Sequence, residues 1–194
     1  MESESGRSLH GEEAGLDVVV GLGSNLGDCR LTLRRAVLGL AIWSPSLSIS
    51  SVYRSAPVGG PPQPDFLNAA VRLRYPGSAA SLLRDLLALE RAAGRERRER
   101  WGPRSLDLDI LWVAGFELAQ PGLCIPHPRL RERAFALRPL LDVAPDAVDP
   151  RDGVSYATIL GELGMSGIQL LAATWFELPF ADPPLGMDSP GPGW

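Results

Sequence analysis

The chain has 194 residues, of which 45% are hydrophobic, enough for one globular domain with a sizeable core. Its formal net charge of −4 disfavours a protein that binds nucleic acid or membrane surfaces through bulk electrostatics. Two cysteines are too few for a disulfide framework and no secretory or membrane-spanning segment is apparent, so we expect a cytoplasmic protein. All 19 basic residues are arginine, which excludes the Walker A loop and the protein-kinase scheme, because both need a lysine.

A short β-rich run over residues 17–21 predicts the first strand, and glycines in residues 21–27 predict a turn after it. Asp28 is placed to cap the helix that follows, since apolar residues recur behind it at helical spacing. The spacing of the glycines differs by one residue from a dinucleotide-binding fingerprint, and the acidic partner for a ribose is missing. A plain glycine turn explains the glycines but does not explain Ser24 and Asn25, which could equally be local caps.

Two further strands are predicted over residues 47–53 and 66–75, where apolar and polar side chains alternate. The Pro-rich connection between them, residues 56–64, is too long for a tight hairpin and is typical of a binding loop or lid. Asn68 is a polar amide within the second of these strands. It is either a solvated strand residue or a group that reads the donor and acceptor edge of a heterocycle.

Ser78 opens a second helix and Gly94 is a good terminator for it. A strand over residues 106–111 follows, and a Pro-rich connection then leads to a last helix over residues 135–141. The order strand, helix, strand, strand, helix, strand predicts an α+β ferredoxin-like sandwich. In this fold an antiparallel sheet has helices packed on one of its faces.

Neither internal repeats nor a second domain is apparent in the sequence. We expect a flexible polar arm over residues 1–15, a single domain over residues 16–165, and a C-terminal extension over residues 166–194. The end of the extension is rich in proline and glycine and has little apolar periodicity, so it is also expected to be flexible.

The most informative segment is residues 100–111, in which a basic Gly-Pro loop runs into a strand with two aspartates. Because strand side chains alternate between faces, Asp107 and Asp109 share one face while the leucines around them face a core. Two carboxylates suit Mg²⁺, which completes its ligand shell with water and substrate phosphates. Arginines that can grip phosphate oxygens precede them: Arg95, Arg97, Arg98, Arg100 and Arg104. Each part alone could be a solvated face or helix end, but together they favour a nucleotide phosphate and metal site.

The sequence resembles the 6-hydroxymethyl-7,8-dihydropterin pyrophosphokinases, the folate-pathway family that moves a diphosphate from ATP to a pterin alcohol. Four blocks carry the resemblance in order, and they are Gly21–Gly27, Ser51–Val71, Gly94–Ile110 and Ile125–Leu140. The resemblance covers about residues 17–162, and the third block is highly specific. It implies that this chain transfers diphosphate to the hydroxymethyl group of the reduced pterin and releases AMP.

The resemblance also implies the roles of individual residues. Asp107 and Asp109 would hold two Mg²⁺ ions, and Arg95 and Arg104 would be catalytic residues that steady the transferring diphosphoryl group. ATP contacts are implied for Glu90, Arg97, Trp101, Ile110, His127 and Arg133, with Trp101 in a mobile lid. Pterin contacts are implied for Ser55, Ala56, Val58, Phe66, Asn68 and Phe135, the two phenylalanine rings sandwiching the bicycle. For Glu90, solvation on the helix flank is an alternative.

The partners implied are small molecules, namely ATP as co-substrate and the reduced pterin alcohol, with no nucleic acid or membrane, and we expect a monomer. Phe66 stands where tyrosine is frequent in the family, Ala56 where proline is common, and Gly122 and Cys124 where Arg and Thr can lie near the nucleotide.

Three alternatives remain open at this point. They are a ferredoxin-like RNA-binding module, an inactive paralogue, and a pyrophosphokinase with another acceptor.

Overall fold

The structure is a computed structural model, and it describes residues 15–94 and 102–176. Its central sheet has six strands in the order β5-β1-β4-β3-β8, with β2 also pairing with β4, and every pairing is antiparallel. The strands of this sheet are β1 (Leu16–Ser24), β2 (Ser48–Ile49), β3 (Val52–Ser55), β4 (Phe66–Tyr75), β5 (Asp107–Val113) and β8 (Ile168–Ala172). The chain order β1, α1, β3, β4, α2, β5 confirms the predicted ferredoxin-like sandwich.

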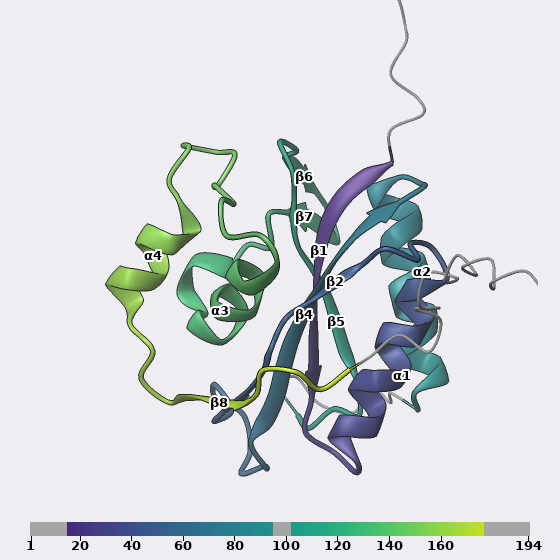
Figure 1. The fold of residues 1–194 in the computed structure, drawn as a ribbon, viewed down its shortest axis with the longest axis vertical. Coiled ribbons are helices and arrows are strands. Elements are labelled where there is room, and N and C mark those ends of the chain that lie inside the picture. The colour runs from purple at the N-terminus through teal and green to yellow at the C-terminus, as the bar shows by residue number, and fades with distance from the viewer. Residues whose placement is uncertain (1–14, 95–101, 177–194) are drawn as a thin grey trace, which may run out of the picture.

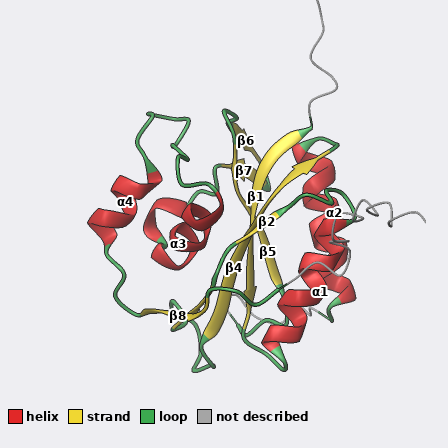
Figure 2. Ribbon diagram, viewed as in Figure 1, coloured by secondary structure: helices red, strands yellow, loops and turns green. Residues whose placement is uncertain are grey.

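Helices cover both faces of the sheet (Figure 1). Helices α1 (Cys29–Ala41) and α2 (Ala79–Ala92) lie on one side, and α3 (Ala134–Val143) and α4 (Tyr156–Leu163) lie on the other (Figure 2). A small second sheet pairs β6 (Leu118–Gln120) with β7 (Leu123–Ile125), and a short 3₁₀ turn, η1 (Leu130–Glu132), precedes α3.

The predicted helix starts are present in the structure. The side chain of Asp28 accepts a hydrogen bond from the backbone N–H of Leu31 at 3.0 Å, and Ser78 does the same for Ser81 at 3.1 Å. Each side chain therefore satisfies one of the donors that the first turn of a helix leaves without a partner. Gly94 follows α2 with a φ of +74°, a left-handed conformation that glycine adopts at little cost.

The prediction of helices on one face only is wrong, because the central strand carries apolar side chains on both faces. Val18, Val19 and Val20 of β1 are all fully buried. Val18 and Val20 pack against α1 and α2, whereas Val19 packs against α3 and α4. Three consecutive buried residues mean that both faces of the strand need cover. Helices α3 and α4 supply that cover on the second face.

The glycine segment also differs from the prediction, because β1 continues through Gly21 and Gly23 to Ser24. A Cβ at Gly21 would lie 3.0 Å from the side chain of Leu111 in the neighbouring strand, so a larger residue there would require Leu111 to shift. Gly21 therefore allows Leu111 to pack closely against β1 in the middle of the sheet. Beyond Ser24 the chain turns into α1 at Gly27, whose φ is +67°.

The packed part of the chain extends beyond the domain end that we expected at residue 165. Strand β8 pairs with β3, and the Trp175 indole Nε1 donates a hydrogen bond to the carbonyl of Ser50 at 2.8 Å. The strand gives a weak sequence signal because it is short and half-exposed, with Leu170 at 55%. The expected arm and the Pro/Gly-rich end lie largely outside the described residues. Among the residues that are described, no helix has both the length and the apolar character to cross a membrane.

Candidate active site

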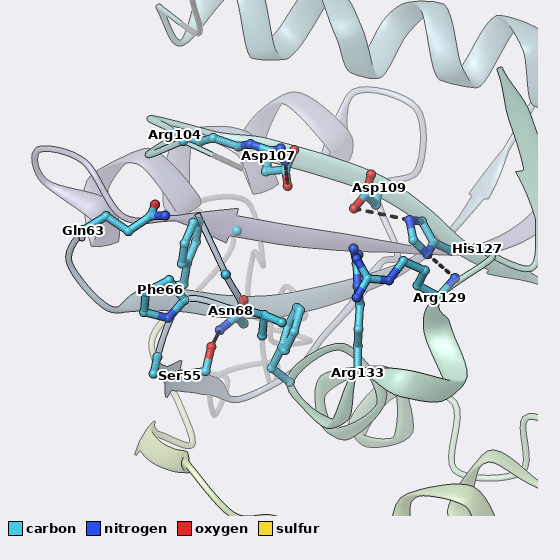
Figure 3. Close-up of a pocket in the computed structure, with 17 residues that line it drawn as sticks. Ser55, Gln63, Phe66, Asn68, Arg104, Asp107, Asp109, His127, Arg129 and Arg133 are labelled. Carbon is cyan, nitrogen blue, oxygen red and sulfur yellow. Dashed lines mark hydrogen bonds and ion pairs between the residues drawn. The ribbon is translucent and has the colours of Figure 1, made fainter. Parts of the chain in front are cut away.

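A cavity of about 300 Å³ opens between the first residues of β4 and β5 and the start of α3. Four segments supply its walls: the loop after β3, the start of β4, the residues that enter β5, and the stretch from His127 to Phe135 (Figure 3). The residues that line it are Gly23, Ser55, Ala56, Pro57, Val58, Gly59, Gln63, Phe66, Asn68, Gly102, Arg104, Asp107, Asp109, His127, Arg129, Arg133 and Phe135. Sequence segments more than 50 residues apart therefore meet in one site.

Two carboxylates of β5 line the cavity because of the alternation of the strand. Leu108 and Ile110 point into the core between the sheet, α1 and α2, while Asp107 and Asp109 point into the cavity. Arg104 Nη1 donates a hydrogen bond to Asp107 Oδ2 at 2.5 Å, an ion pair three residues apart in sequence. Burial, followed by the charge of Asp107, raises the pKa of Asp109 to about 6. A bound cation would relieve both effects.

His127 faces the second carboxylate, with its Nε2 4.0 Å from Asp109 Oδ2. Burial and then the charge of Arg133 lower the pKa of His127 to about 4, so its imidazole is neutral at pH 7. The backbone N–H of Arg129 donates to His127 Nδ1 at 3.1 Å. Because Nδ1 accepts this bond, the ring proton is on Nε2, which makes Nε2 a hydrogen-bond donor toward the cavity.

The opposite wall is aromatic and neutral. Phe66 from β4 and Phe135 from α3 both line the cavity, and the guanidinium carbon of Arg133 lies 5.8 Å from the centre of the Phe135 ring. Asn68 Nδ2 donates to Ser55 Oγ at 2.9 Å, and both side chains are buried. The solvated-strand interpretation of Asn68 is therefore wrong, and the hydroxyl of Ser55 fixes the orientation of the amide.

Asn25 is a buried side chain that joins two walls of the site, and sequence reasoning missed this role. Its Oδ1 accepts from the backbone N–H of Arg104 at 2.7 Å, and its Nδ2 donates to Gln63 Oε1 at 2.9 Å and to the Pro64 carbonyl at 3.0 Å. Ser24 Oγ donates to the carbonyl of Ser105 at 2.6 Å. Ser24 and Asn25 therefore do not act as local caps here. They hold segments about 40 and 80 residues away in the sequence.

Eleven of the sixteen predicted site residues line this one cavity: Ser55, Ala56, Val58, Phe66, Asn68, Arg104, Asp107, Asp109, His127, Arg133 and Phe135. Arg95, Arg97 and Trp101, together with Arg98 and Arg100 of the basic loop, lie outside the described residues. The side chain of Ile110 is in the core, on the opposite face of β5 from the cavity.

Glu90 does not line the cavity and is only 2% exposed, so the solvated-flank alternative is wrong. Its Oε1 accepts the backbone N–H of Leu108 at 2.8 Å. This bond ties the end of α2 to β5 at Leu108, the residue between the two aspartates. In the structure Glu90 therefore holds the strand that carries them.

Six lining residues were not singled out from the sequence: Gly23, Pro57, Gly59, Gln63, Gly102 and Arg129. Most of them lie in loops that were predicted to close over a ligand, so the loops were recognised but not the individual positions. Arg129 sits among other arginines in the segment from His127 to Phe135, and composition alone does not separate it from its neighbours.

The chain is similar to known proteins over most of its described length. The family model described as 7,8-dihydro-6-hydroxymethylpterin-pyrophosphokinase matches residues 19–145. A 2-amino-4-hydroxy-6-hydroxymethyldihydropteridine pyrophosphokinase of Synechocystis sp. is 42% identical over 153 residues, covering 77% of each chain. One of Methylorubrum extorquens is 42% identical over 153 residues, 77% of this chain and 95% of the relative.

A solved structure has the same fold. It is the wild-type Plasmodium falciparum HPPK-DHPS with pterin and p-hydroxybenzoate, with a TM-score of 0.63 and 14% identity. The match covers 79% of this chain but only 44% of that fused chain, and at this identity it shows the fold alone. The family model and the two bacterial relatives span most of the described domain, and the chain therefore belongs to the 7,8-dihydro-6-hydroxymethylpterin-pyrophosphokinase family.

Proposed function

We propose that the cavity described above is where this enzyme transfers diphosphate from ATP to the hydroxymethyl group of 6-hydroxymethyl-7,8-dihydropterin, with release of AMP. Family membership and the names of the relatives give the reaction, its place in folate biosynthesis, and ATP as co-substrate. The observation that carries the assignment to this cavity is its division into two walls. Two carboxylates and three arginines face two phenylalanines and a buried amide across the same space.

We assign the neutral wall to the pterin. A flat bicyclic ring fits between Phe66 and Phe135, where aromatic stacking adds to the burial of apolar surface. Asn68, held by Ser55, would pair with the edge of the ring. Ala56 and Val58 line the same part of the cavity and would contact the substrate chiefly through their backbone.

We assign the charged wall to the triphosphate and to two Mg²⁺ ions. The donor set fits magnesium, because Asp107 and Asp109 offer hard oxygen ligands on one face and repel one another without a cation. When bound, the ions would neutralise phosphate charge that builds up during transfer. Arg104 and Arg133 would bind phosphate oxygens, and the neutral His127 would donate a hydrogen bond from Nε2.

With both substrates in place, the chain mainly aligns them and neutralises the charge of the phosphate groups. The hydroxyl oxygen forms a bond to the β-phosphorus, the bond from that phosphorus to the α,β-bridging oxygen breaks, and the hydroxyl proton is released. Phosphoryl-type transfer needs little covalent help from a protein, so positioning and electrostatics account for most of the rate. Closure of the loop over residues 56–64 would exclude water.

An RNA-binding module is not supported by the structure. Such modules of this fold stack bases on aromatic side chains of an open sheet face. In the described part of this chain, α1 and α2 cover one face and α3 and α4 pack on the other. We also propose a monomeric cytoplasmic enzyme, in keeping with its two free cysteines and its use of ATP.

The decisive experiment is product analysis with ATP, Mg²⁺ and the reduced pterin alcohol. We expect pterin-dependent AMP and a diphosphorylated pterin, identified by phosphorus NMR. Asp107→Ala and Asp109→Ala should nearly abolish turnover in folded protein, and Arg104→Ala should lower kcat more than ATP affinity. ADP with a monophosphorylated pterin would contradict the reaction. Near-wild-type rates in both aspartate variants would instead remove the metal assignment alone.

A further inference from the structure

One of the three arginines of the charged wall has been given no contact of its own. Arg129 lies between His127 and η1, and it lines the cavity together with Asp109, His127 and Arg133. Figure 3 shows its side chain running from the backbone beside His127 toward the region of Arg133. Its position on the charged wall calls for an anionic partner.

The backbone of Arg129 is held in place, whereas its guanidinium is only loosely held. The backbone N–H is fixed by its hydrogen bond to His127 Nδ1 at 3.1 Å. The side-chain Nε donates to Glu132 Oε2 at 3.1 Å, and the two side chains are 42% and 63% exposed. An ion pair this exposed contributes little to stability, because water solvates both charges and both side chains lose conformational freedom. The guanidinium can therefore change partner at low cost.

The aspartates of the cavity no longer balance its three arginines once they bind magnesium, so the Arg129 guanidinium then needs another anion. Asp107 pairs with Arg104 at 2.5 Å, and Asp109 attracts Arg133. Arg129, by contrast, repels the neighbouring basic groups, and its charge helps to lower the pKa of both His127 and Arg133. If both aspartates bind magnesium, they have less charge to offer to the three arginines, and phosphate oxygens are the remaining acceptors.

We propose that Arg129 is a ligand of the nucleotide's phosphate groups, and that Glu132 holds its guanidinium while the cavity contains no nucleotide. This inference rests on the proposed function, since it assumes that the charged wall binds ATP. Arg129 contributes to ground-state binding of the polyphosphate, so its loss weakens nucleotide binding and leaves pterin binding unchanged. Glu132 competes with the nucleotide for the same guanidinium, so its neutralisation strengthens nucleotide binding.

The test uses Arg129→Gln, Glu132→Gln and the double variant, with Arg84→Gln as a matched control. Arg84 is a helix α2 arginine with a 73% exposed side chain and does not line the cavity. Calorimetry with Mg²⁺ and α,β-methylene-ATP measures nucleotide affinity without turnover, and steady-state kinetics measures kcat and both KM values. All variants keep the remaining site residues, and circular dichroism with thermal melting checks their folding.

We expect Arg129→Gln to raise the dissociation constant of the analogue about tenfold or more, as loss of a charge-assisted hydrogen bond does. Arg84→Gln should leave it unchanged. Glu132→Gln should lower it by roughly two- to fivefold, the range of an exposed pair, and this gain should vanish in the Arg129→Gln background. Arg129→Gln should also leave the pterin KM unchanged.

Three results would overturn the inference. One is an analogue affinity in Arg129→Gln equal to that of the Arg84→Gln control. A second is a loss confined to pterin binding. A third is a Glu132→Gln effect of equal size with and without Arg129, which would remove the competition. Because calorimetry reports nucleotide binding directly, these outcomes remain readable even if product analysis with the pterin alcohol failed and the proposed function fell.

Discussion

Arg104 and Asn25 form a reciprocal pair of hydrogen bonds across 79 residues of sequence. The backbone N–H of Arg104 donates to Asn25 Oδ1 at 2.7 Å, and the backbone N–H of Asn25 donates to the Arg104 carbonyl at 3.0 Å. Asn25 also holds Gln63 and Pro64 of the loop that forms the pterin side of the cavity. One buried amide therefore links the two walls of the site.

Asn25→Ala should lower both stability and rate. It removes three side-chain hydrogen bonds and leaves the N–H of Arg104 without its partner, which costs about 1–3 kcal/mol for a buried group. Arg104 then keeps only the backbone bond from the Asn25 N–H to its carbonyl, so its position is less firmly held and kcat should fall more than the thermal shift alone explains. Asn25→Asp keeps the acceptor for Arg104 but loses the donor to Gln63, so it should retain more kcat than Asn25→Ala. Equal kcat in both variants would show that the Arg104 contact is not what matters.

Asp109→Asn should stabilise the metal-free protein at neutral pH while abolishing activity. Burial raises the pKa of Asp109 to about 6, above the value of about 3.9 in an unfolded chain. A raised carboxyl pKa favours folding below the unfolded value, and that contribution is lost as pH rises through 6. The melting temperature of Asp109→Asn minus that of wild type should therefore be positive at pH 7.5 and shrink toward pH 5. Added Mg²⁺ should reduce this difference in melting temperature at pH 7.5, because it stabilises wild type alone.

Asp149→Asn should destabilise the face of the sheet that α3 and α4 cover. Asp149 is fully buried and accepts hydrogen bonds from Arg131 at 2.7 Å and from Arg151 at 2.5 and 2.8 Å. Weakening these charge-assisted contacts should cost on the order of 3 kcal/mol, taking about 1.5 for each arginine. Arg131 lies in η1, so the loss should also loosen the segment between His127 and Arg133.

The pH dependence of this effect has a definite sign. The two arginines hold the pKa of Asp149 well below its usual range. Its contribution is therefore present above the unfolded value of about 3.9 and is lost as pH falls below it. Urea denaturation at several pH values should show a constant difference between wild type and Asp149→Asn from pH 5 to 8, narrowing in stronger acid. A difference that grew in acid would contradict the assignment.

Ending the chain at residue 166 should destabilise the enzyme, whereas ending it at residue 176 should not. The shorter chain lacks β8, which pairs with β3, and lacks the Trp175 indole, which donates to the Ser50 carbonyl. Residues 177–194 have little apolar periodicity, so their removal is expected to cost little activity. Thermal melting and turnover of the two truncated chains test both statements. A large loss of thermal stability or turnover in the chain that ends at residue 176 would show that the final 18 residues also pack or cover the site.

The sequence alone indicated the ferredoxin-like order of strands and helices and the two aspartates of the candidate site, and its resemblance to one family indicated the reaction class. Alternation in the strand after the arginine loop was enough to put Asp107 and Asp109 on one face, because the period of a strand depends only on local backbone geometry. The caps at Asp28 and Ser78 were likewise local, since each side chain bonds a backbone group three residues away.

Only the tertiary structure decided which distant segments meet. The bonds from Asn25 to Arg104, the burial of Glu90 under Leu108, and the pairing of β8 with β3 all join residues far apart in the chain. None has a periodic signal, because a single polar contact depends on where the fold brings its partner. The cover of α3 and α4 over the second face, with three successive buried valines in β1, was decided in the same way. Local rules fixed the helices and strands that were predicted, and long-range packing brought their residues together in one cavity.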